Sequence, residues 1–175
     1  SFFARKIRNY YVRKGNHISK AGWPVNTDFR GDFFTCAVYS LGASLVKKDW
    51  LLQSPYDETL DQYGIGDNYG VILGFPSPVV HVVNKTFVHH HREPTNRLKS
   101  SLQYYRRVMA LDYFRRLGKT PGHVKKGWLL WSLAGSCINF FFAGQWSGVK
   151  ITIKSIRLIL FNRNPNRKAA KKSIE

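Results

Sequence analysis

Hydrophobic residues recur at helical spacing in the second half of the chain. Pro94-Thr95 opens one such pattern and Gly118 followed by Pro121 closes it, which predicts a long helix between them. Its apolar face collects Leu98, Leu102, Tyr105, Met109 and Phe114. Residues 149–161 alternate apolar with basic positions, a pattern that fits a strand or an amphipathic helix and favours the helix.

No charged residue occurs from Gly127 to Val149, and the segment 128–144 is almost wholly apolar. Its length approaches that of one membrane crossing. Ser132, Ser136, Asn139 and Gln145 weaken that interpretation, and basic residues flank both ends without giving a topology. The pattern favours a helix lying in or dipping into a membrane interface, with a true span or a buried soluble helix as alternatives.

In the first half of the chain the hydrophobic runs are shorter. Apolar runs predict a strand at 33–39 and two further strands at 79–83 and 86–90, joined across Asn84-Lys85. The run 54–58, in which Ser-Pro precedes Tyr-Asp-Glu, predicts a helix start. Residues 1–13 mix aromatic with basic positions at near-helical spacing.

Charge changes the picture, because the net charge of +18 is unevenly spread. Residues 1–93 hold 11 Lys+Arg and 8 Asp+Glu, whereas residues 94–175 hold 17 and 2. The second half therefore suits an anionic partner, either lipid or nucleic acid. From Asp49 to Asn84 there is no Lys or Arg, and this acidic island is either a solvated loop or a place for chemistry.

Several classes of chemistry lack their residues. Cys36 and Cys137 form neither a zinc pattern nor a disulfide framework, which suits two buried thiols in a reducing compartment. The chain contains no phosphate-loop motif and no G-x-S-x-G elbow. It also lacks the signatures of RNA-recognition domains and zinc fingers.

The best candidate chemistry pairs Asp67 with a histidine cluster. Asp67 lies in the glycine-rich run 64–70, and the histidines at 89–91 follow at the end of a predicted strand. A carboxylate held in such a turn can act as a general base toward a hydroxyl. A histidine at a strand end can complete a divalent metal site that is otherwise made of carboxylate and phosphate oxygens.

The order of these motifs resembles the acceptor half of family 2 glycosyltransferases. The motifs that carry the resemblance are Gly42-Ala43-Ser44-Leu45, Tyr56-Asp57-Glu58, Gly64-Ile65-Gly66-Asp67 and Val88-His89-His90. The resemblance covers roughly residues 10–115. It implies an α/β chain, the carboxyl-terminal half of an A-type glycosyltransferase fold with a mixed sheet and flanking helices, followed by amphipathic and apolar helices.

The resemblance also implies roles for residues. Asp67 matches the family's catalytic base, whose task is to deprotonate the acceptor hydroxyl during an inverting transfer. Gly42, Ala43, Ser44, Gly66 and Asn68 match substrate-binding positions. His90 matches the metal-site histidine, with His89 and His91 as alternatives, and the implied cofactor is a divalent metal, Mg or Mn.

We therefore expect a partial catalytic domain at 1–117, membrane-associating helices at 118–162 and a basic flexible tail at 163–175. The chain contains no D-x-D motif, so we expect it to be the carboxyl-terminal part of a longer enzyme. The expected partners are a nucleotide-sugar donor, a glycan or lipid-linked acceptor and an anionic membrane surface, at the cytoplasmic face of the inner membrane, with nucleic acid unexpected. The alternatives are a basic RNA-binding protein and a membrane-anchored protein without enzymatic activity.

Overall fold

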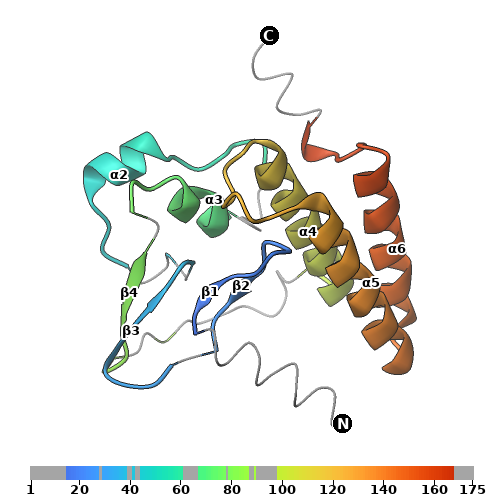
Figure 1. Ribbon diagram of the computed structural model, residues 1–175, viewed down its shortest axis with the longest axis horizontal. Helices are drawn as coiled ribbons and strands as arrows, with labels where there is room; N and C mark the ends of the chain where they lie inside the picture. The colour runs from blue at the N-terminus through green and yellow to red at the C-terminus, as the bar shows by residue number, and fades with distance from the viewer. Residues whose placement is uncertain are drawn as a thin grey trace.

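The long helices lie on one side of the molecule, and the short strands lie on the other side together with two shorter helices (Figure 1). The structure is a computed structural model that describes residues 15–27, 29–38, 41, 44–60, 67–77, 79–86, 89 and 98–167. Its elements in chain order are β1 (His17–Ile18), β2 (Pro24–Val25), β3 (Phe33–Cys36), α2 (Lys48–Gln53), α3 (Asp67–Leu73), β4 (Val80–Val83), α4 (Ser100–Arg116), α5 (Lys126–Phe142) and α6 (Trp146–Leu160).

The described strands form two antiparallel pairs. β1 pairs with β2, and β3 pairs with β4 so that Phe33 faces Val83 and Cys36 faces Val80. Helices combined with small antiparallel sheets give a fold that is broadly α/β.

The strand partner predicted for 79–83 was wrong. Residues 80–83 are a strand, but they pair with β3, and neither Thr86 nor His89 is in a strand. Asn84 explains the difference, because its backbone N–H donates to the Asp32 carbonyl at 2.7 Å and its side chain to two carbonyls of the 29–31 loop. Asn84 and Lys85 therefore close a long-range pair rather than a local hairpin.

The predicted helix start at Ser54 was also wrong, because Ser54 ends a helix. α2 ends at Gln53. This end is expected, because Pro55 disfavours helical backbone in the residue before it, Ser54. The Ser54 hydroxyl is buried and donates to the Val71 carbonyl of α3 at 2.9 Å. Residues 55–60 then form irregular structure and a turn.

The core is centred on the second half of α4. All seven residues from Val108 to Phe114 are buried, because α3 and the β1–β2 hairpin lie on one side of this helix and α6 on the other. Phe114 is fully buried, and its ring occupies the space that a Cβ at Gly70 of α3 would need. The helix predicted here is confirmed, although it starts at Ser100, after the non-helical Leu98 and Lys99.

α5 and α6 form a helical hairpin, which confirms the helix at 128–144 and the preference for helix at 149–161. Gly144 turns the chain with a positive φ of 68°. Gly148 then allows close approach, because a Cβ there would lie 2.6 Å from the Phe140 ring. Within the part of the chain that the structure describes, no helix has the length and apolarity to cross a membrane.

One hydrophobic cluster runs through the predicted boundary at 117/118. Leu129, Leu133 and Ile159 belong to the same cluster of buried residues as Phe114. The predicted flexible tail was wrong at Asn164, which is buried and donates to the Met109 carbonyl and the Asp112 carboxylate, each at 2.9 Å. Residues 168–175 of that tail, like the predicted helix at 1–13, lie outside the described residues.

Candidate active site

Asp67 lies in the middle of the glycine-rich run 64–70, and the described residues of α3 begin with it. The described part of Asp67 is its backbone. The rest of α3 is firmly held, since Tyr69, Val71 and Ile72 are all buried in the core. The fold therefore gives the start of this short helix a fixed position against α4.

Tyr69 anchors α3 to the β1–β2 hairpin. Its hydroxyl donates to the Gly22 carbonyl at 2.9 Å, and its ring lies 6.0 Å from that of Phe114. Burial raises the pKa of the Tyr69 phenol well above its usual range, so the group stays protonated and remains a donor at neutral pH. Gly22 itself has a positive φ of 91° and packs against Leu111 so closely that a Cβ would lie 2.7 Å from it.

The same turn also holds α5. The Trp23 indole N–H donates to the Ser132 hydroxyl at 2.9 Å, and the Lys125 backbone N–H donates to the Lys20 carbonyl at 3.2 Å. The Lys20 ammonium lies 5.1 Å from the centre of the Trp128 ring, within the range of a cation–π contact. Residues 19–23 thus connect the helix that begins at Asp67 to the α5–α6 hairpin.

Asp57 has a structural role, but it lies in a turn and not at the helix start predicted for residues 54–58. Its Oδ1 accepts hydrogen bonds from the backbone N–H and the hydroxyl of Thr59, which closes a turn. Its Oδ2 accepts from the Tyr113 hydroxyl at 3.1 Å, and the Lys119 ammonium lies 3.9 Å away. The carboxylate that was expected at a helix start therefore ties the 55–60 turn to α4.

The other predicted site residues are only partly described. Ser44 is exposed and its hydroxyl donates to the Leu41 carbonyl at 2.9 Å, Asn68 is half-buried as the second residue of α3, and His89 is exposed. Gly42, Ala43, Gly66, His90 and His91 lie outside the described residues. Among the residues that are described, no group of three or more His, Cys, Asp or Glu side chains could hold a metal ion.

Asp112, which was not among the predicted site residues, has the most deeply buried carboxylate in the part of the chain that the structure describes. Its side chain is fully buried, and its two oxygens accept hydrogen bonds from Arg115 at 2.7 Å and Arg116 at 2.8 Å. Asn164 supplies a third donor. The signal was available, because Asp112 is the only acidic residue between Pro94 and Ile174 and has arginines three and four positions later.

Comparison with known proteins gave no match to a family model, a curated protein or a solved structure. Function is therefore inferred from the residues themselves and from the positions that the fold gives them.

Proposed function

We propose that residues 1–117 are the acceptor half of a family 2 glycosyltransferase with the A-type fold, and that Asp67 is its general base. The observation that carries the proposal is the position of Asp67 in α3, directly after Gly64-Ile65-Gly66 in the sequence. The family's catalytic Asp lies on a helix N-terminus. The rigid packing of α3 through Tyr69, Val71 and Ile72 gives further support.

In the proposed reaction a sugar passes from a nucleotide-sugar donor to a hydroxyl group. An Asp carboxylate is ionised at neutral pH, so Asp67 accepts the proton of the acceptor hydroxyl. The resulting oxygen nucleophile forms a bond to the anomeric carbon from the face opposite the nucleotide. The bond from that carbon to the diphosphate breaks, the nucleotide diphosphate leaves with the electron pair, and the configuration inverts.

The resemblance assigns a divalent metal, Mg or Mn, to His90, with His89 or His91 as alternatives. A bound metal of this kind stabilises negative charge on a departing diphosphate. Gly42, Ala43, Ser44, Gly66 and Asn68 would contact the sugar or the acceptor.

The acceptor class in this proposal is a glycan or a lipid-linked sugar at the cytoplasmic face of the inner membrane. The charge distribution supports this setting, because 17 of the 28 Lys+Arg lie in residues 94–175 with only 2 acidic residues. Anionic lipid headgroups attract such a segment.

Replacing Asp67 by Asn tests the proposal. Because these 175 residues contain no D-x-D motif, the assay uses the longest open reading frame that includes them. Asp67→Asn should reduce sugar transfer by about a thousandfold, since general-base catalysis contributes roughly 10²–10⁴-fold. Binding of the nucleotide sugar, measured by calorimetry, should stay nearly unchanged.

Asp49→Asn is the matched control, because Asp49 belongs to the same acidic island and lies exposed in the first turn of α2. This variant should retain full transfer. Full transfer by Asp67→Asn would remove Asp67 as the base, and loss of nucleotide-sugar binding in that variant would point to a structural role instead.

A further inference from the structure

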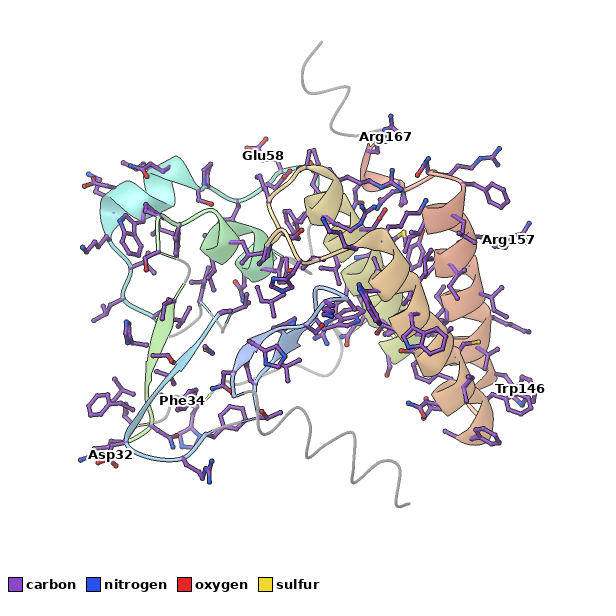
Figure 2. The ribbon with its side chains drawn as sticks, in the orientation of Figure 1. Asp32, Phe34, Glu58, Trp146, Arg157 and Arg167 are labelled. Atoms are coloured by element: carbon purple, nitrogen blue, oxygen red, sulfur yellow. The ribbon has the colours of Figure 1, made fainter. Side chains whose placement is uncertain are left out.

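The tip of the α5–α6 hairpin is an exposed aromatic cluster. The Phe141 ring centre lies 5.7 Å from that of Phe142 and 5.5 Å from that of Trp146. All three side chains are exposed, and 83% of Phe142 is accessible to solvent. We call these three residues the aromatic tip. Figure 2 shows Trp146 at the end of the hairpin farthest from Arg167, pointing away from the body of the molecule.

The outward faces of both helices continue this surface. On α5 the exposed apolar side chains next to the tip follow at helical spacing, namely Ile138, Trp131 and Trp128, and 74% of Trp131 is accessible. On α6 the outward face alternates, since Lys150, Ile153 and Arg157 follow Trp146 at steps of three or four residues. Lys154 is also exposed and lies beside this face, with its ammonium 5.2 Å from the centre of the Tyr105 ring of α4. Arg157 also points outward from the free side of α6 (Figure 2).

These aromatic side chains lie outside the cluster of buried hydrophobic residues that forms the core. The inner face of α6 is made of small and aliphatic residues, Gly148, Thr152, Ser155 and Ile159, all of them buried. The two hydroxyls on this face donate to backbone carbonyls one turn earlier, at 2.7 and 2.8 Å. The inner contact is therefore complete, and the tip and the outward faces remain for an external partner.

Charge identifies the chemistry of that partner. Residues 113–174 contain 13 Lys+Arg and no Asp or Glu. A second copy of the chain packed on the outward face of α6 would bring its own Lys150 and Arg157 against those of the first copy and would be repelled. RNA would find an outward face of α5 that carries no charged residue from Gly127 to Phe142, with the Lys20 ammonium near Trp128, at the end of this face away from the tip. A bilayer with anionic headgroups suits both the aromatic surface and the cations of the hairpin. Aromatic rings bury at its interface, and lysine and arginine reach its phosphates.

We propose that the aromatic tip of the α5–α6 hairpin inserts into the headgroup region of an anionic phospholipid bilayer, with Lys150, Lys154 and Arg157 over the lipid phosphates. The helices need not cross the bilayer for this contact. The inference does not depend on the chemistry proposed for Asp67, because its test contains no sugar nucleotide.

The test is flotation of the 175-residue chain with vesicles of phosphatidylcholine containing 30% phosphatidylglycerol. Replacing both Phe142 and Trp146 by Ser should weaken binding by about a hundredfold, since burial of a large apolar side chain contributes roughly 1.5–3 kcal/mol. Replacing Lys150, Lys154 and Arg157 by Gln should weaken it by up to about a hundredfold, since each cation near such a surface contributes about 1 kcal/mol. Wild-type binding should fall sharply on vesicles of pure phosphatidylcholine.

Matched controls come from the opposite side of the molecule. Phe33 on β3 and Leu52 on α2 are each 69% exposed, so Phe33→Ser with Leu52→Ser removes comparable apolar surface away from the hairpin. Lys47, Lys48 and Lys85, all exposed, give the matching triple change to Gln. Both control variants should float like the wild type, and circular dichroism verifies that every variant is folded.

Three results would overturn the proposal. Equal flotation of the tip variant and its control would remove the tip as the contact. A wild-type dimer in sedimentation velocity that the tip variant converts to monomer, with no flotation of either, would identify a second copy as the occupant. Binding to an RNA oligonucleotide that depends on the three cations but not on the tip, again without flotation, would assign the surface to nucleic acid.

Discussion

α4 and α5 are both 17 residues long, yet the helix with more charged residues, α4, is the more buried of the two. α4 carries four arginines and Asp112, but its stretch from Val108 to Phe114 is completely buried. α5 has no charged residue after Lys126, but it exposes Trp131, Ile138 and Phe142. Burial therefore depends on what packs around a helix. α4 is enclosed on several sides and its buried charge is paired, whereas α5 lies at the edge with an apolar face turned outward.

The largest difference in stability is expected between Phe114 of α4 and Phe142 of α5 when each is replaced by Ala. Phe114→Ala removes a fully buried ring that packs on Gly70 and Tyr69, and it should lower the free energy of unfolding by about 4 kcal/mol. Phe142→Ala at the hairpin tip should change it by less than about 0.5 kcal/mol. Urea denaturation of the two variants measures both values, and similar losses would mean that the tip belongs to the core.

A second pair contrasts buried with exposed charge. Asp112→Ala leaves Arg115 and Arg116 without their shared acceptor, and it should lower the free energy of unfolding by about 3 kcal/mol. Asp32→Ala breaks the exposed ion pair with Lys85 and should cost less than about 1 kcal/mol. Thermal unfolding monitored by circular dichroism separates the two, and a small loss for Asp112→Ala would show that water replaces the carboxylate.

The smallest changes in stability are expected when two glycines of the α5–α6 hairpin, Gly148 and Gly135, are each replaced by Ala. Gly148→Ala forces a Cβ against the Phe140 ring and should cost about 1 kcal/mol net, since the overpacking exceeds the gain in helix propensity. Gly135→Ala meets no atom within 4 Å and should stabilise the protein by about 0.5–1 kcal/mol. Opposite shifts in the urea midpoint are expected, and stabilisation by both changes would show that α5 and α6 are less closely packed.

Local patterns predicted the helices well and the long-range contacts poorly. The long α4, α5 and α6 follow from periodicity and from the glycines near their ends, and Gly118 and Gly144 both have positive φ. α2 went unpredicted because six residues hold too few periods to be recognised. The pairing of β3 with β4 could not be predicted, since it joins residues nearly fifty positions apart and the nearer partner at 86–90 had an equally good pattern.

In the candidate site, too, the contacts between residues far apart in the sequence were not predicted. The glycine-rich run 64–70 predicted a turn around Asp67, but residues 67–73 form the helix α3. The role of Asp57 was not predicted, because its contact with Tyr113 spans 56 residues and depends on tertiary packing. Asp112 was missed for the same reason. Two of its donors are local, but the third comes from Asn164, whose burial no local pattern indicates.

The contact between Asn164 and α4 affects how the protein can be made. During synthesis the Asp112 carboxylate and the Met109 carbonyl leave the ribosome well before the amide that donates to both. α4 can form early, but its polar centre is completed only when the chain has been translated through Asn164. A shortened product that stops after α6 would contain α2 to α6 and still lack that last donor.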